Sequence, residues 1–245
     1  MIFLGTSLLD PIKTPLRWLL EEIHTTTGLP WAWAIITLTV IVRLAMVPLT
    51  VKQQQSMRRM QAIQPEIKKL QDKYRGDRQV LNQKMMEFYK ENNVNPFASC
   101  LPLVVQFPIF IGLYYTLRQT SGFIKPGDDV SFLGSFVPDI TAPLRSLPTV
   151  SLVVLMLIYI GSQVGSTLLM PSSVDPRQKY LFAALPVLFA GVILSQHFPA
   201  GLLLYWITSN LWTVGQAAII RQWYPPPAFA VPAAPVKPQR KPKKT

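Results

Sequence analysis

A single charged residue, Arg43, lies inside the long apolar segment 35–50. The nearest charged residues along the chain are Glu22 and Lys52. At about 1.5 Å of rise per residue, Arg43 lies roughly 18 Å from Trp31 and roughly 13 Å from Lys52 along a helix. If the segment spans a membrane, Arg43 is therefore near its centre, where an arginine costs about 2.5–3.5 kcal/mol on insertion scales. The sequence predicts that Arg43 turns toward a polar or hydrated interior.

The composition of the whole chain is typical of a membrane protein. Of the 245 residues, 49% are hydrophobic and only 15% are charged, and the charges are segregated along the chain. Soluble domains carry about a quarter charged residues. We therefore predict an all-α membrane protein with several spans and no large soluble domain. The single cysteine, Cys100, excludes an internal disulfide and a cysteine-cluster metal site, and we predict neither a metal nor a cofactor.

Five apolar segments are predicted to cross the membrane, at 29–51, 96–117, 148–170, 179–195 and 200–220. The intervening segments are predicted as an amphipathic N-terminal helix (1–28), a helical hairpin (52–95), a loop (118–147), a short link (171–178), a tight turn (196–199) and a basic disordered tail (221–245).

The N-terminal segment is too short and too charged to span. Its apolar residues recur at helical spacing between Asp10 and His24, which favours an amphipathic helix on the membrane surface. An ordinary helix that caps the bundle fits the same pattern. Residues 1–9 are apolar but follow no basic region, so no signal peptide is predicted.

The hairpin segment differs in character from its apolar neighbours. Residues 52–95 hold ten Lys/Arg and five Asp/Glu, with a break of turn chemistry at 75–78. In a five-span chain the hairpin lies on the same side as 171–178 and 221–245, and these three segments together carry most of the Lys/Arg of the chain. The positive-inside rule therefore predicts a cytoplasmic hairpin and C-terminus, with the N-terminus outside.

Polar residues recur at helical spacing within four of the five spans. Thr39 lies one turn before Arg43, and the other polar positions are Ser99 and Gln106, then Tyr159, Ser162, Gln163 and Ser166, then Trp206, Ser209, Asn210, Thr213 and Gln216. Hydrogen bonding between helices explains single Ser or Thr residues. It does not explain Arg43, because no predicted span contains an acidic partner. These residues therefore indicate a hydrated cavity that accepts negatively charged groups.

Four motifs in order resemble the YidC/Oxa family of membrane protein insertases, in its short bacterial form. They are IVRLAMVPLT at 41–50, Gln64-Pro65, NPFASCLPLVVQFPIF at 95–110 and FPAGLLLYWITSN at 198–210. The resemblance covers about residues 15–222. It implies five spans around a hydrophilic groove that opens to the cytoplasm, in a bacterial cell membrane.

The resemblance also implies roles for particular residues. The groove is expected to include Arg43, Thr39, Gln106, Gln163 and Trp206, together with Ser209, Asn210, Thr213 and Gln216 of the last span. The hairpin is expected to recruit substrates through Met57, Met60, Ile67, Arg75, Arg78 and Phe88. A hairpin with no specific role remains an alternative.

The expected partners are nascent membrane proteins and the lipid bilayer, with the ribosome, the Sec translocon and the signal recognition particle receptor as further candidates. The basic tail residues Lys237, Arg240, Lys241, Lys243 and Lys244 are expected to contact ribosomal RNA or anionic lipid. One bundle contains the whole groove, so a monomer suffices.

Three other functions are compatible with parts of the sequence. An anion or small-solute transporter would use Arg43 as its binding charge, but no internal repeat is evident. An intramembrane enzyme is disfavoured because no Gly-x-Ser-x-Gly motif occurs and no span carries a carboxylate. An assembly chaperone that does not insert its clients shares every feature of the sequence.

Overall fold

The computed structural model describes residues 3–92, 94–95, 101–118, 124–169 and 176–223. Within these residues the regular structure is helical, and β pairing is limited to two isolated bridges. The prediction of an all-α protein is confirmed.

The helices follow the chain in an order close to the predicted segments. They are α1 (Phe3–Thr27), α2 (Trp31–Ala45), α3 (Val47–Ala62), α4 (Gln64–Lys73), α5 (Arg78–Glu91), α6 (Leu101–Arg118), α7 (Thr149–Leu169), α8 (Pro176–Ser195) and α9 (Ala200–Trp223), with short 3₁₀ turns η2 (Gly134–Phe136) and η3 (Leu144–Ser146). Helix α1 lies within the predicted N-terminal helix 1–28 and continues through Pro11 and Pro15.

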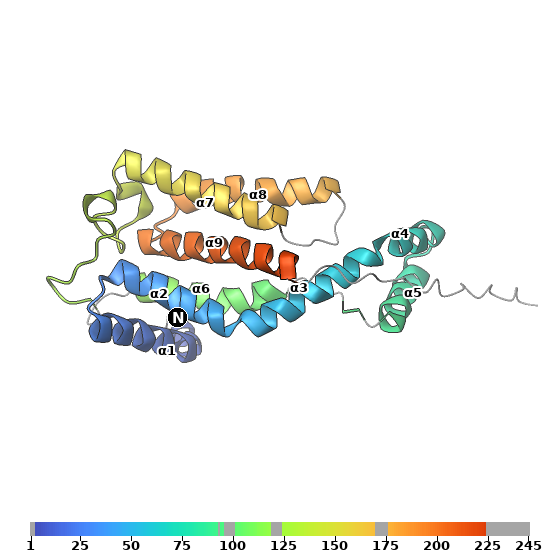
Figure 1. Ribbon diagram of the computed structural model, residues 1–245, viewed down its shortest axis with the longest axis horizontal. Helices are drawn as coiled ribbons and strands as arrows, with labels where there is room; N and C mark the ends of the chain where they lie inside the picture. Colours follow the sequence, from blue (N-terminus) through green and yellow to red (C-terminus); the bar gives the residue numbers. More distant parts are fainter. Residues whose placement is uncertain (1–2, 93, 96–100, 119–123, 170–175, 224–245) are drawn as a thin grey trace, which may run out of the picture.

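Helix α9 is the centre of the bundle. It lies between α7 and α8 on one side and α2 and α6 on the other (Figure 1). Its first turns are buried, with Leu202 and Leu203 fully enclosed. At Gly201 a Cβ atom would lie 3.1 Å from side-chain carbons of both Ile35 and Leu117. The absence of a side chain there allows three helices to meet closely.

The segment 124–147 closes one end of this bundle. Its apolar side chains Val137, Ile140 and Leu144 are buried in the main core. Its backbone also joins the start of α9, since the Gly201 amide donates to the Ile140 carbonyl over 2.7 Å. The indole of Trp31 on α2 donates to Asp128 over 3.0 Å. This loop is therefore packed structure, which its proline and glycine content did not predict.

The hairpin extends from the opposite end of the bundle (Figure 1). Helix α2 ends at Ala45 and α3 starts at Val47, with Pro48 in its first turn, where a missing amide hydrogen costs little. Asp77 caps α5 by accepting hydrogen bonds from the amides of Gln79 and Val80, at 3.0 and 3.1 Å. A small core of Met60, Ile63, Ile67 and Val94, with Met85, Phe88 and Tyr89 against it, holds the hairpin together.

Among the described residues, one helix is long and apolar enough by itself to cross a membrane, namely Thr149–Leu169. A second candidate is the pair 10–27 and 31–45, whose two helices are bent by 118°. Helix α2 alone has 15 residues, because the chain breaks at Met46. The number of five spans therefore stays a prediction.

Candidate functional site around Arg43

Arg43 lies on α2, half-buried in the bundle and one turn after Thr39. Thr39 is buried and donates its hydroxyl to the Ile35 carbonyl over 2.7 Å, so its polar group is satisfied within its own helix. Arg43 makes no hydrogen bond or ion pair with any of the described residues. Arg43 is thus a cation within the bundle that can bind water or an anionic group.

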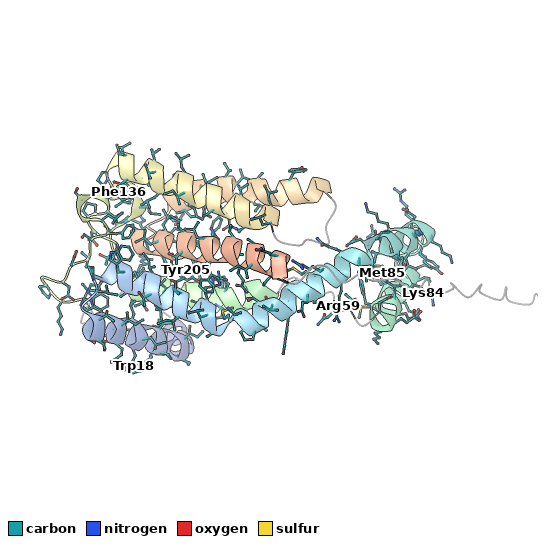
Figure 2. All side chains as sticks on the ribbon, in the orientation of Figure 1. Trp18, Arg59, Lys84, Met85, Phe136 and Tyr205 are labelled. Carbon is teal, nitrogen blue, oxygen red and sulfur yellow. The ribbon has the colours of Figure 1, made fainter. Side chains whose placement is uncertain are left out.

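Tyr205 connects Arg43 to two further polar residues, Gln106 on α6 and Ser209 on α9. The Tyr205 ring on α9 is buried and interacts electrostatically with Arg43. Gln106 on α6 donates its side-chain amide to the Tyr205 hydroxyl. Figure 2 shows Tyr205 between α9 and α2. We call Arg43, Gln106, Tyr205 and Ser209 the Arg43 cluster.

Ser209 completes the Arg43 cluster one turn after Tyr205. It is 2% exposed, and its hydroxyl has no well-placed hydrogen-bond partner among the described residues, although it lies close to Tyr205. A buried hydroxyl without a partner costs about 1–3 kcal/mol unless water satisfies it. The Arg43 cluster can therefore form a further hydrogen bond through the Ser209 hydroxyl.

Polar contacts continue from the Arg43 cluster toward the hairpin. The side-chain amide of Gln216 on α9 donates to the Thr50 hydroxyl on α3, and the Trp212 indole donates to Gln216 Oε1 over 2.9 Å. Thr213 donates to the Ser209 carbonyl within α9 over 2.8 Å. The polar face between α2–α3 and α9 thus runs from the middle of the bundle to the root of the hairpin.

The remaining predicted groove residues on α9 have other surroundings. Asn210 donates to the Ser162 hydroxyl of α7 over 3.3 Å, on the helix that also carries the half-buried Gln163. Trp206 packs in an aromatic cluster, stacked on Phe110 at 4.9 Å and tilted against Tyr159 at 5.8 Å between ring centroids. The single polar stripe read from the sequence is therefore divided between two faces of α9.

Tyr205 was missed by the sequence analysis. Its aromatic ring matches the apolar run before it, and the polar stripe was assigned to the neighbouring Trp206. The available signal was its spacing, because Tyr205 lies four residues before Ser209 and hence on the same face of the helix.

The predicted recruitment residues of the hairpin fall into two groups. Met57, Met60 and Ile67 are buried, and Phe88 packs against the hairpin core. Arg75 and Arg78 are exposed at the tip. The predicted tail contacts, Lys237 to Lys244, lie outside the described residues.

The hairpin surface also carries an exposed ion pair on α5. Lys84 Nζ lies 2.6 Å from Glu87 Oε2. The hydrogen bond between them raises the pKa of Lys84 and lowers that of Glu87. No group of three or more His, Cys, Asp or Glu residues that would suit a metal ion occurs in the part of the chain that the structure describes.

The fold and the site together define a class: a helical bundle with apolar side chains facing outward, such as Leu188 at 73% exposure, and a polar cluster around an arginine inside. A family model described as "60Kd inner membrane protein" matches residues 22–227, and the chain belongs to that family.

Individual relatives agree with this assignment. The chain is 39% identical over 210 residues to the "Membrane protein insertase YidC" of Polynucleobacter asymbioticus, covering 84% of this chain and 34% of that protein. It is 31% identical over 272 residues to the protein of the same name from Streptomyces avermitilis, covering 93% of this chain and 61% of that protein. The chain thus spans between a third and about three fifths of the length of these relatives.

A solved structure is also similar. A structure described as "Active YidC insertase crystal structure with the first transmembrane domain resolved" superposes with a TM-score of 0.61 at 28% sequence identity. The match covers 88% of this chain and 46% of that one. The bundle and its hairpin therefore have a counterpart among known YidC structures.

Proposed function

We propose that this chain is a membrane protein insertase that also assists the folding of its clients and performs no covalent chemistry. The observation that carries the proposal is Arg43, a cation inside the bundle without an ion-pair partner in the described residues. The names of the relatives support the same activity.

In this proposal the chain crosses the bacterial cell membrane five times, with its N-terminus outside and its C-terminus in the cytoplasm. The helices α2, α6, α7, α8 and α9 are the spans. The loop 124–147 closes the outer end of the bundle, where Trp31 and Asp128 fasten it to α2. The hairpin then projects into the cytoplasm, in agreement with its basic composition.

The hairpin makes the first contact with a nascent chain. Its tip presents Arg75 and Arg78 to solvent, whereas its apolar residues hold the two arms together. Capture at the tip therefore relies on charge. The tail is proposed to contribute further cationic contacts to the ribosome or to anionic lipid, and the Sec translocon and the signal recognition particle receptor are further proposed partners.

The Arg43 cluster receives the polar segment that must cross. A hydrated groove between α2, α6 and α9 shortens the apolar path for that segment, and Arg43 attracts its acidic side chains. Gln106, Tyr205 and Ser209 supply hydrogen-bonding groups beside the cation. The Arg43 cluster thus replaces part of the hydration that the segment loses.

The apolar segment of the substrate leaves along the outside of the bundle. Ile41 and Leu44 on α2 and Leu211 and Ile219 on α9 are exposed apolar side chains near the Arg43 cluster in sequence. A hydrophobic helix that slides past them enters lipid directly, driven by apolar burial and the membrane potential. One copy of the chain suffices for these steps.

Insertion into proteoliposomes tests the proposal. With a substrate that carries an acidic outer segment, Arg43→Ala is expected to lower insertion at least about tenfold, because a charge-assisted contact is lost. Arg43→Lys keeps the charge and is expected to retain much of the activity. The control Arg118→Ala removes an exposed arginine from the end of α6 and is expected to insert normally. Equal insertion by Arg43→Ala and the wild type would remove Arg43 from the mechanism.

A further inference from the structure

A polar cavity lies between α1 and α6, apart from the Arg43 cluster. It has a volume of about 400 Å³ and is lined by one face of α1 and by Tyr115 and Thr116 of α6. No residue of the Arg43 cluster lines it. Its volume falls in the range of small-ligand sites, roughly 300–1,000 Å³.

The close approach of α1 to α6 beside this cavity depends on Gly112. A Cβ atom at Gly112 would lie 2.4 Å from Leu16 Cδ1 and 3.1 Å from Ile12 Cγ2. The helices therefore touch along the apolar face of α1, and the polar residues of α1 stand at the edge of this contact. The cavity is thus formed by the close packing of α1 against α6.

The charges of the cavity have a definite order. Along the lining face of α1 come Asp10, Lys13, Arg17 and Glu21, two cations flanked by two anions. Lys13 lies 2.9 Å from Asp10 and 5.9 Å from the centre of the Tyr115 ring. The formal charge of the four groups sums to zero, so neither a simple anion nor a simple cation matches the whole site.

A zwitterion matches this order of charges. A phosphate ester between Lys13 and Arg17 would accept their hydrogen bonds. An ammonium group one turn away would meet Asp10 or Glu21, with the Tyr115 ring available for a cation–π contact. Headgroups that join a phosphate to an amine at this spacing belong to zwitterionic phospholipids.

The surroundings of the cavity favour a lipid over a free solute. Trp18 lines the cavity and is 60% exposed, and it stands at the outer edge of α1 in Figure 2. Exposed tryptophan on an amphipathic helix is typical of the membrane interface. The opposite face of α1 is buried in the bundle through Leu20, so the cavity opens at the boundary of the helix pair.

We propose that the cavity between α1 and α6 binds the headgroup of a zwitterionic phospholipid, with its phosphate at Lys13 and Arg17 and its amine at Asp10, Glu21 or Tyr115. The bound lipid fixes α1 at the interface. This site is independent of the proposed insertase activity, and its test measures lipid retention alone.

Native mass spectrometry of the full chain, titrated with phosphatidylethanolamine, tests this site. The double variant Lys13→Gln/Arg17→Gln is expected to retain the lipid about tenfold less well than the wild type, because two charged hydrogen bonds are lost. The control Arg118→Gln/Lys125→Gln removes two positive charges outside the cavity, and this variant is expected to retain the lipid as well as the wild type does.

Two further arms identify the ligand. Asp10→Asn/Glu21→Gln keeps the cations and is expected to lose the preference for phosphatidylethanolamine over phosphatidylglycerol, which lacks the amine. Millimolar inorganic phosphate is expected to leave the bound lipid in place. Equal retention by the wild type and Lys13→Gln/Arg17→Gln, or displacement of the lipid by free phosphate, would overturn the proposal.

Discussion

At the scale of single residues, Arg43 and Tyr205 are the pair on which the proposed function depends. Arg43 has no ion pair among the described residues, and Tyr205 brings a buried hydroxyl toward it from the central helix. The cost of a cation in this position is acceptable only if water or an anionic segment of a substrate solvates it. The Arg43 cluster is therefore expected to be hydrated.

The Tyr205 hydroxyl is expected to matter for transport of a polar segment. Tyr205→Phe leaves the Gln106 amide without its acceptor and is expected to reduce insertion of an acidic-tailed substrate about 3- to 10-fold, since such hydrogen bonds contribute about 0.5–1.5 kcal/mol. Tyr159→Phe, on α7, is the matched control and is expected to insert normally. Equal effects of the two variants in the proteoliposome assay would argue against a special role for Tyr205.

Gly201 is expected to be sensitive to any side chain. Gly201→Ala places a Cβ atom 3.1 Å from Ile35 and Leu117 carbons and 3.3 Å from the Ile140 carbonyl oxygen, and overpacking of this kind costs about 1–3 kcal/mol. The thermal unfolding midpoint of Gly201→Ala in detergent is therefore expected to lie below that of the wild type. Gly161→Ala, in a helix with open space around it, is expected to melt at or above the wild-type temperature. A Gly201→Ala midpoint equal to that of the wild type would contradict the close packing described here.

The sequence reveals some of these residues and hides others. Arg43 is evident because charge is rare in an apolar run, and Gln106 and Ser209 follow from helical spacing. Tyr205 and the aromatic surroundings of Trp206 depend on how α9 is rotated against α2 and α7. That rotation depends on tertiary packing between helices, including the close contacts at Gly201, which the spacing of residues within one helix does not encode.

At the scale of elements, the hairpin and the bundle have separate cores. Ile67 belongs to the hairpin core, together with Met60, Ile63 and Val94, whereas α9 belongs to the main core. A substitution in one core should therefore destabilise that core and leave the other unchanged.

Ile67→Ala is expected to loosen the hairpin without loosening the bundle. The change leaves a cavity in a small core and costs about 2–5 kcal/mol locally. Hydrogen exchange is expected to accelerate in α4 and α5 and to stay unchanged in α9. Lys69→Ala, an exposed substitution on the same helix, is the control. Faster exchange throughout α9 would show that the two cores are coupled.

The attachment of the segment 124–147 to the bundle is expected to lose stability in acid. The Lys125 amide and the Trp31 indole donate hydrogen bonds to Asp128 and lower its pKa below the ordinary value of 3.8. A carboxylate with a lowered pKa contributes stability above its ordinary pKa, and this contribution is lost as the pH falls through the lowered value.

Asp128→Asn is therefore expected to melt below the wild type at neutral pH and to converge with it in acid. Thermal melting followed by tryptophan fluorescence measures this difference. Asp72→Asn, an exposed change on the hairpin, serves as the control. A difference between Asp128→Asn and the wild type that persists below the lowered pKa would mean that the charge of Asp128 is not responsible.

The elements themselves were partly predictable. The turn before α5 follows from the Gly-Asp pair at 76–77, and the break after Ala45 follows from Pro48. The break at Ile63 was not predicted, although Pro65 offered the same kind of signal. The packing of 124–147 into the core was also missed, because turn residues suggest a loop and say nothing about what covers Val137 and Ile140.

At the scale of the whole molecule, the two ends of the bundle differ. One end is closed by the segment 124–147, and the other continues through α3 into the hairpin (Figure 1). The polar face that starts at the Arg43 cluster runs toward the hairpin through Gln216 and Thr50. In the proposed mechanism, the end that leads to the hairpin admits a polar segment from the cytoplasm, and the end closed by 124–147 retains it.

A measurement of water access to the Arg43 cluster decides whether the groove exists. Arg43→Cys and Gln106→Cys, each in a Cys100→Ala background, would be probed with a membrane-impermeant thiol reagent from either side, with the outward-facing Ile41→Cys as the control. A groove that opens to the cytoplasm predicts labelling of the two groove cysteines from the cytoplasmic side only and none at Ile41→Cys. Labelling from both sides would indicate a transporter, and no labelling of either groove cysteine from either side would mean a dry bundle and contradict the groove mechanism.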